Sequence, residues 1–343
     1  MKPKVLILLQ TKNSFIDLVK LNLEKNNYEV DVHPIDKTKK LKINWIIKLI
    51  NLISFPFYKK GNFISKVQNK YTKQNNYNHE LNLKSVTNKT FDYTLVFRAD
   101  EFEDALLIKL KKKSKKFIAF HWDGLERTPN IFSKIKLFED FYTFEPNDAI
   151  NYKLKFITNF YFDFIELPKT KKAKWDITYI GYFNAQRFYL LNKLAKKHPL
   201  LRLNFSLKTF FINDKLMLES SNKINDLKDF YSYIELLKVH NNSNAILDIK
   251  AEIHNGLSFR FFEAIQLDKK IITTNSNVKQ YDFYNSNNIL VIDNSLDDLK
   301  DFLLKPFIPY SENIKIKYSF SNWFQNIIDS KNCIKIEMPY LNV

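Results

Sequence analysis

The sequence predicts an α/β protein with two Rossmann-like domains and a cleft between them. Short apolar runs alternate with amphipathic helical patterns along the chain, which is typical of parallel βαβ units. The series is interrupted by the charged, proline-containing segment Leu167–Lys174, whose composition is that of an interdomain linker. A length of 343 residues also suits two domains better than one. We therefore expect an N-terminal domain over 1–166, a C-terminal domain over 167–315, and a C-terminal helix and tail over 316–343 that returns to the N-terminal domain.

In the N-terminal half, runs rich in Val, Ile, Leu and Phe predict six strands. They are Lys4–Leu9, Glu29–His33, Phe91–Phe97, Lys116–Phe120, Phe141–Phe144 and Phe156–Tyr161. Amphipathic patterns predict helices over Phe15–Lys25 and Glu101–Lys112. The irregular region from residue 37 to residue 90 reads as an insertion into this domain.

The C-terminal half shows the same alternation. Its predicted strands are Asp176–Gly181, Leu201–Leu207, Ala245–Ile249, Lys270–Thr274 and Ile289–Ile292. Its predicted helices are Arg187–Lys197, Leu227–Val239 and Leu257–Leu267. Because ligands of open α/β sheets bind outside the carboxyl ends of the strands, the loops that follow these strands are the places to look for a site.

The composition limits the function classes. The chain carries a net charge of +17, from 54 basic and 37 acidic residues, which favours an anionic partner: nucleic acid, a membrane surface or a phosphorylated small molecule. Because the lysines are spread along the chain, the charge alone does not choose among these. The single cysteine, Cys333, excludes an internal disulfide and a Cys-based zinc site and indicates a reducing, cytoplasmic environment. No apolar run approaches the roughly 20 residues of a membrane span.

The strongest ligand-binding pattern is the strand–loop–helix–strand unit over residues 245–275. Its loop holds Gly256, one of only four glycines, and a glycine there lets the backbone approach a ligand closely. The N–H groups and the dipole at the start of the following helix favour phosphate. Arg260 and Glu263 are three residues apart and share a helix face, so that the guanidinium is suited to a diphosphate and the carboxylate to ribose hydroxyls. From the spacing alone, an ordinary βαβ unit with a surface Arg–Glu ion pair is the simpler explanation.

Three stretches of the chain add a resemblance. They are residues 246–275, residues 119–126 with 141–148, and residues 176–187, which contain the sequences Gly-Leu-Ser-Phe-Arg-Phe-Phe-Glu-Ala, His-Trp-Asp-Gly and Tyr-Ile-Gly-Tyr-Phe-Asn. These stretches resemble a bacterial family of GT-B-type glycosyltransferases that act in lipopolysaccharide-core and capsular polysaccharide synthesis. The resemblance covers about residues 115–330, and the first of the motifs is specific to the family but not to a sugar.

The resemblance implies a GT-B fold whose C-terminal domain binds a nucleotide-sugar, with no cofactor and no essential metal. It implies that Glu263 holds the ribose, that Arg260 and Arg187 lie near the diphosphate, and that Gly181 ends a strand facing the cleft. The segment that completes the implied donor site consists of Asn255, Gly256, Leu257 and Ser258. Retaining members carry a glutamate eight positions before the ribose glutamate. Asn255 stands there in this chain, which leaves the stereochemistry of transfer open.

Three residues of the N-terminal half are candidate catalytic bases. His121 and Asp123 follow the predicted strand that ends at Phe120, and Asp100 follows the strand that ends at Phe97, so all three lie at carboxyl ends of strands. Burial can tune the pKa of a His or Asp toward neutrality, as a general base for an acceptor hydroxyl requires. The alternative is that these side chains only fix their loops by hydrogen bonds.

The predicted partners are a nucleotide-sugar donor and a saccharide or lipid-linked saccharide acceptor. The apolar stretch Asn44–Phe57 has lysines on both sides, which suits an interfacial helix on an anionic membrane, although a core helix of the N-terminal domain is the simpler explanation. An interfacial helix would bring the protein to the inner face of the cytoplasmic membrane.

Other enzyme classes lack their motifs here. The first strand is not followed by Gly-x-Gly-x-x-Gly, and no Walker, Gly-x-Ser-x-Gly, His-Glu-x-x-His or Asp-x-Asp sequence occurs. The six histidines are scattered, so no metal site is expected.

Two rival functions are a nucleic-acid-binding protein, suggested by the charge, and a catalytically inactive glycosyltransferase-like domain. The Phe and Tyr residues fall mostly in predicted strands and helices, which argues against a nucleic-acid interface.

Overall fold

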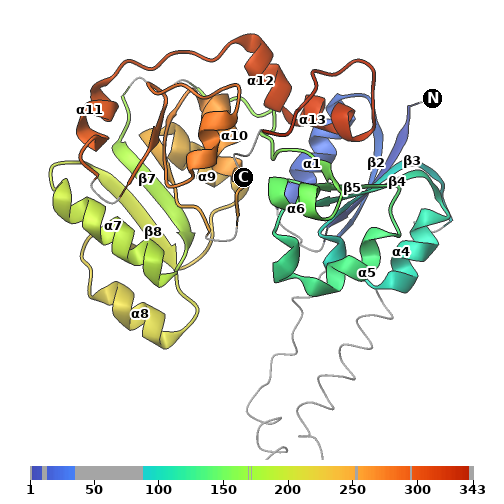
Figure 1. Cartoon of the computed structure of the whole chain (residues 1–343), viewed down its shortest axis with the longest axis horizontal. Helices are drawn as coiled ribbons and strands as arrows, with labels where there is room; N and C mark the ends of the chain where they lie inside the picture. The colour runs from blue at the N-terminus through green and yellow to red at the C-terminus, as the bar shows by residue number, and fades with distance from the viewer. Residues whose placement is uncertain are drawn as a thin grey trace, which may run out of the picture.

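The chain forms two α/β units, each built on a six-stranded parallel sheet (Figure 1). The strand order is β2-β1-β3-β4-β5-β6 in the first sheet and β12-β11-β10-β7-β8-β9 in the second. Both orders turn back beside the first strand of their unit, as in doubly wound α/β folds, so the predicted fold class is confirmed. The computed structural model describes residues 2–9, 14–34, 88–168, 170, 172–251, 254–293 and 296–339.

The N-terminal unit alternates strands with helices and short 3₁₀ turns. Its strands are β1 (Lys4–Leu9), β2 (Glu29–Pro34), β3 (Phe91–Phe97), β4 (Ser114–His121), β5 (Asp140–Thr143) and β6 (Lys155–Phe156). Its helices are α1 (Ser14–Lys25), α4 (Asp104–Lys111), α5 (Phe132–Ile135) and α6 (Pro146–Asn151), with 3₁₀ turns η2 (Ala99–Glu101), η3 (Leu125–Arg127) and η4 (Pro129–Ile131).

The C-terminal unit follows the same plan. Its strands are β7 (Trp175–Tyr182), β8 (Leu203–Lys208), β9 (Asn225–Asp226), β10 (Ser243–Asp248), β11 (Lys270–Thr273) and β12 (Ile289–Val291). Its helices are α7 (Ala185–Lys197), α8 (Ile212–Glu219), α9 (Tyr233–Asn241), α10 (Phe259–Leu267) and α11 (Leu299–Leu304), with the 3₁₀ turn η5 (Ser276–Gln280). Two further helices, α12 (Glu312–Tyr318) and α13 (Phe320–Ile327), carry the chain back to the first unit (Figure 1).

Two predicted elements differ from the structure. The strand expected over Phe156–Tyr161 ends at Phe156, because the backbone beyond it pairs elsewhere: Tyr161 N–H donates to the carbonyl of Tyr318, which lies in α12. The helix expected from Leu227 begins only at Tyr233. Ser232 caps it there with Glu235 in a capping box, which fixes the first turn at that position. Apart from residues 88–90, the predicted insertion, including Asn44–Phe57, lies outside the described residues.

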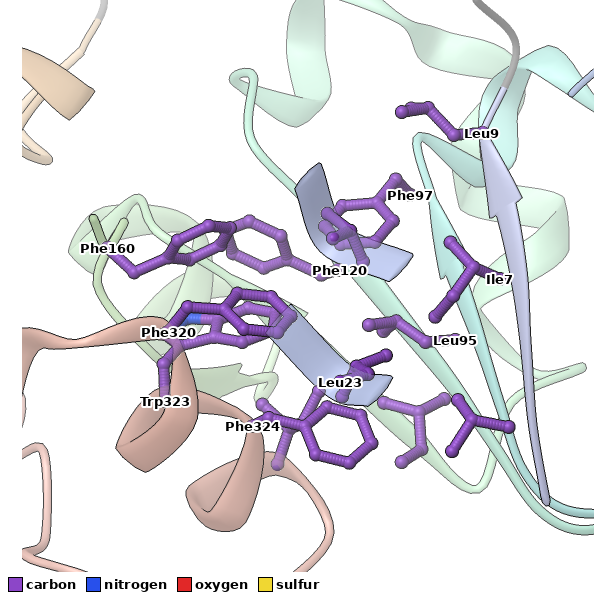
Figure 2. Close-up of a cluster of buried hydrophobic side chains, with 14 of the residues drawn as sticks. Ile7, Leu9, Leu23, Leu95, Phe97, Phe120, Phe160, Phe320, Trp323 and Phe324 are labelled. Carbon is purple, nitrogen blue, oxygen red and sulfur yellow. The ribbon is translucent and has the colours of Figure 1, made fainter. Parts of the chain in front are cut away.

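Aromatic side chains fill the core between the first sheet and α13. Trp323 of α13 is fully buried, and its ring centroid lies 4.9 Å from that of Phe120 and 4.6 Å from that of Phe160. Figure 2 shows Phe320 and Trp323 beside Phe160, facing the apolar side chains of the sheet. The indole N–H of Trp323 donates to the carbonyl of Thr158 at 2.8 Å, so the buried polar atom is satisfied. The helix α13, the last described helix of the chain, is therefore part of the core of the N-terminal unit.

No helix within the described ranges is long and apolar enough to cross a bilayer.

Replacing Trp323 with Ala should lower the free energy of unfolding by about 3–5 kcal/mol, because the change leaves a large cavity in a packed core. Trp323→Phe keeps most of the ring packing and loses mainly the hydrogen bond to Thr158, so about 1–2 kcal/mol is expected. Urea unfolding followed by fluorescence measures both values. Equal, small losses for the two variants would contradict the packing of α13 into this core.

Candidate active site

The carboxyl edges of the two sheets meet at the segment that leads from β10 into α10. The segment contacts loops of the N-terminal unit through successive residues. The contacts are His254 Nε2 to Asp123 Oδ1 at 3.0 Å, the amide nitrogens of Asn255 and Gly256 to Glu145 Oε2 at 2.6 and 3.0 Å, and Asn159 Nδ2 to the carbonyl of Leu257 at 2.9 Å. Candidate donor and catalytic residues that are far apart in the sequence thus lie together.

An apolar contact supports the same junction. Phe259, the first residue of α10, packs against Phe15 of α1 with ring centroids 5.6 Å apart and against Phe160 at 5.3 Å. Tyr233, the first residue of α9, packs against Phe15 at 6.0 Å. Edge-on aromatic packing of this kind stabilises the contact beyond the burial of its area. The start of α10 is therefore held against the first sheet by apolar as well as polar contacts.

Arg260 is anchored at the carboxyl edge of the second sheet. Its Nη2 donates to the carbonyl of Ile180 at 2.8 Å, its Nη1 lies 3.4 Å from Asp248 Oδ1, and its guanidinium stands over the ring of Tyr179 at 5.2 Å. Asp248 ends β10 and also accepts from the hydroxyl of Ser258 at 2.7 Å. About a fifth of the Arg260 side chain stays exposed, at 22%. The arrangement fixes a permanent positive charge at the place where the sequence predicts a diphosphate.

Gly181 and Arg187 lie beside this arginine. A Cβ on Gly181 would stand 2.9 Å from the Tyr179 hydroxyl, so a side chain there would displace the buried tyrosine. Arg187 is in the first turn of α7, where Asn184 caps the helix, and its Nη1 donates to the carbonyl of Tyr182 at 3.2 Å. Burial raises the pKa of the Tyr179 hydroxyl against a lowering effect of Arg260 and Arg187. Both arginines are thus near the same ring.

Glu263 lies one turn into α10 and faces α9. Its side chain is only 3% exposed, and its Oε2 is 3.0 Å from Nδ1 of the buried His240, although the pair lacks the alignment of a hydrogen bond. Burial, with a further contribution from the charge of Glu263, raises the pKa of the nearby Tyr233. The structure therefore does not bring Glu263 into the exposed group around Arg260, and its role at a ribose stays a prediction.

The candidate bases belong to a network centred on Arg98. This residue has a left-handed backbone (φ 55°, ψ 66°) and makes a two-pronged contact to Asp100, with Nε–Oδ1 and Nη2–Oδ2 distances of 2.8 Å each. Its Nη1 lies 3.4 Å from Asp123 Oδ2. Burial raises the pKa of Asp123, but the hydrogen bond from His254 and the charges of Arg127 and Arg98 outweigh it and lower the pKa to about 2. In this arrangement Asp123 is an ionised anchor for the segment before α10.

Asp123 Oδ1 is the shared acceptor at this junction. The ring nitrogen His254 Nε2 lies 3.0 Å from Asp123 Oδ1 and 3.1 Å from the amide nitrogen of Gly124. One ring nitrogen does not donate and accept at the same time, and the Gly124 amide also lies 3.0 Å from Asp123 Oδ1. Both His254 Nε2–H and the Gly124 N–H therefore donate to the carboxylate.

His121 is fully buried. Its Nδ1 lies 3.6 Å from Asp100 Oδ1, which is too long for a hydrogen bond, and its Nε2 lies 3.2 Å from the hydroxyl of Thr128. Burial lowers the pKa of His121 to about 4 in spite of the opposing charge of Asp100. The imidazole is therefore neutral at pH 7. The three candidate bases lie together as the sequence predicts, but their catalytic role stays a prediction.

A cavity of about 560 Å³ lies between α7 and the carboxyl ends of β10, β11 and β12. Its lining includes Gln186, Tyr189 and Lys193 of α7 together with Ile249 and Thr274. This volume is within the range of small-molecule sites, roughly 300–1,000 Å³. In the described part of the chain, no group of three or more His, Cys, Asp or Glu residues is placed to hold a metal ion.

Sequence reasoning did not single out Glu145, Asp248 or His254. Asp248 is the last residue but one of the predicted strand Ala245–Ile249 and ends β10 in the structure, so its position near a strand end was a usable signal for a site residue. Glu145 and His254 stand inside stretches that carry the family resemblance. Their partners are more than a hundred residues away in the chain, so no local pattern marks them.

No protein-family model and no curated protein sequence matches this chain. Solved structures are similar in fold. The N-terminal domain of trehalose-6-phosphate phosphatase from Candida albicans is 11% identical, with a TM-score of 0.54 over 96% of this chain and 94% of that one. A glycosyltransferase from Rickettsia africae is 13% identical, with a TM-score of 0.46 over 88% of each chain. T4 phage BGT in complex with UDP and Mn²⁺ is 12% identical, with a TM-score of 0.47 over 96% of this chain and 100% of that one.

The buried neutral imidazole of His121 gives a pH dependence that can be measured. Its pKa is about 4 in the folded protein against 6.5 ordinarily, so between pH 6.5 and 4 the unfolded chain binds more protons and stability falls as the pH falls. From pH 7 to pH 5 we expect this residue to remove about 2 kcal/mol from the free energy of unfolding. His121→Gln lacks the titrating group and should lose correspondingly less in urea unfolding. If the free energy of unfolding depended on pH identically in the two proteins, the lowered pKa of His121 would be contradicted.

Proposed function

We propose that this protein is a glycosyltransferase that moves a sugar from a nucleotide-sugar donor to the saccharide of a growing surface glycan, such as lipopolysaccharide or capsule. The observation that carries the proposal is Arg260 in the first turn of α10, which Ile180 and Asp248 anchor at the carboxyl edge of the second sheet. A fixed guanidinium and helix N–H groups bind a diphosphate leaving group by charge and by hydrogen bonds. The acceptor is a saccharide, free or lipid-linked, and the protein works at the inner face of the cytoplasmic membrane.

The donor site has two parts in this proposal. Arg260, Arg187 and the N–H groups before α10 take the diphosphate, so that fixed positive charges do the work that a metal ion does elsewhere. The nearby cavity of about 560 Å³ beside α7 has the size for the nucleoside. Gly181 lies beside them, where a Cβ would press on the Tyr179 ring that stands under Arg260. Glu263 is proposed for the ribose, which requires that its carboxylate turn away from His240.

The acceptor side is formed by the N-terminal unit. Asp123 is the proposed base, because it lies at the junction with the donor segment, whereas Asp100 is fully engaged by Arg98 and His121 is buried. A carboxylate with a pKa of about 2 accepts a proton well only once the acceptor hydroxyl is already losing it. Closing the two units around the substrates would keep water from the donor.

Arg260→Ala should weaken the binding of the matching nucleotide-sugar by about tenfold to a hundredfold, the usual effect of losing a charged hydrogen bond. A thermal-shift screen with UDP-, GDP- and CMP-sugars identifies the donor, since a ligand that binds the folded state raises its melting temperature. Arg202→Ala is the matched control, because Arg202 pairs with Asp176 at the amino end of β7, away from the site. Arg202→Ala should bind the donor as the wild type does. A donor affinity unchanged in Arg260→Ala, or lowered equally in Arg202→Ala, would refute the proposed site.

Asp123→Asn should lower kcat by about 10²–10⁴ while the KM for the donor changes little, because a general base acts on the transition state. Asp100→Asn should lower kcat less. Steady-state kinetics with the donor found in the screen separates the two effects. If Asp123→Asn instead raised the donor KM and spared kcat, Asp123 would be only an anchor for His254.

A further inference from the structure

The carboxylate of Glu145 joins the N-terminus of α6 to the loop before α10, which belongs to the other unit. Glu145 follows β5 and is 2% exposed. Its Oε1 caps its own helix α6 by accepting from the amide of Asn147 at 3.3 Å. Its Oε2 accepts from the amides of Asn255 and Gly256, at 2.6 and 3.0 Å, just before α10. A single buried anion therefore satisfies donors on both sides of the junction.

The two amides bind this oxygen as they would bind an oxygen of a phosphate. Successive backbone N–H groups that converge on one oxygen form an anion site. Lys250 adds a positive charge, because its Nζ lies 2.7 Å from Asn255 Oδ1. In this structure the anion at the site is a side chain of the other unit.

The fit around Gly256 is close. A Cβ on this residue would lie 2.3 Å from the carbonyl oxygen of Phe144 and 2.7 Å from its ring, so only glycine allows the segment to lie this near to β5. The side chain next to Phe144 in sequence is Glu145, and the close approach brings its carboxylate onto the two amides. The anion at the site is thus fixed by backbone contact as well as by charge.

A carboxylate and a donor diphosphate cannot share these amides. Each amide has one hydrogen to donate, and two anions at the same pair of donors repel each other strongly in a buried setting. A ligand that uses the N–H groups before α10 has to move Glu145 away. The carboxylate keeps the amide of Asn147 as a partner when it moves, because that bond lies within its own unit.

We propose that Glu145 is an internal competitor for the phosphate groups of the donor: its carboxylate holds the amides of Asn255 and Gly256, and a nucleoside diphosphate displaces it. The identity of the anion rests on the proposed function, but the competition does not. Donor binding is then coupled to release of a contact between the two units. Donor affinity is reduced by the fraction of molecules in which Glu145 occupies the site.

The test is the binding of inorganic pyrophosphate to the full chain, measured by calorimetry at constant ionic strength. Glu145→Gln keeps an oxygen for the Asn147 amide but removes the competing charge, so its Kd for pyrophosphate should fall about tenfold if the wild-type site is open in about a tenth of the molecules. Glu139→Gln is the matched control, since Glu139 also accepts a backbone amide, that of Phe117 at 3.1 Å, but at the opposite edge of the sheet. It should bind pyrophosphate as the wild type does.

A second measurement reports on the Gly256 amide itself. Asn255–Gly256 is the only Asn–Gly pair in the chain, so ¹³C′-Asn with ¹⁵N-Gly labelling isolates the amide signal of Gly256. Pyrophosphate should shift this signal in the wild type. The same end point should be reached at about tenfold lower concentration in Glu145→Gln, as expected for removal of a competitor.

The outcomes separate the inference from the proposed function. An unchanged or weaker pyrophosphate affinity in Glu145→Gln, or a Gly256 amide that does not respond in the wild type, would overturn the inference. Glu145 would then be a static clamp, whatever the protein does with nucleotide-sugars. Tighter pyrophosphate binding in a protein that turns over no nucleotide-sugar would instead sustain the anion site and refute the transferase proposal.

Discussion

The contact between the start of α10 and the carboxyl edge of the first sheet is the interaction on which the candidate site depends. Parallel strands place all their carboxyl ends on one edge, and here the edges of two sheets are brought together by the aromatic packing of Phe259 on Phe15 and Phe160. Without this contact, Arg260 and Asp123 would belong to separate surfaces. Apolar packing is neither charged nor directional, so any selectivity of the junction for a ligand depends on the polar groups beside it.

The buried charges at the junction have partners before any ligand arrives. Arg98 engages Asp100 and Asp123, and Asp248 engages Arg260, in each case within one unit. The hydrogen bond from His254 of the other unit, with the charges of Arg127 and Arg98, lowers the pKa of Asp123 to about 2, so its carboxylate is ionised at neutral pH. In the proposed reaction, these fixed cations would stabilise a phosphorylated leaving group as its negative charge develops.

The fold was largely predictable because strands buried on both faces of a parallel sheet appear as short continuous apolar runs. The failures come from contacts distant in sequence. Phe156–Tyr161 is apolar enough for a strand, yet Tyr161 pairs its backbone with α12, over 150 residues away. The start of α9 was recognisable in principle, since Ser232 and Glu235 have the spacing of a capping box, but the apolar residues before them suggested a longer helix.

Only those residues of the candidate site that carry a local sequence signal were predictable. Gly256 stands out because glycine is scarce in the chain, and Arg260 stands out because of its spacing from Glu263 on the helix. Both signals are local in the sequence. Glu145 has no such signal, because its partners are 110 residues further along the chain and its effect depends on distances of 2.6 and 3.0 Å. The glycine at position 256 is a consequence of the same close contact, but the sequence alone does not show which residue requires it. Its missing side chain is required by the carbonyl of Phe144, and the close approach that follows puts the carboxylate of the neighbouring Glu145 on the amides of Asn255 and Gly256.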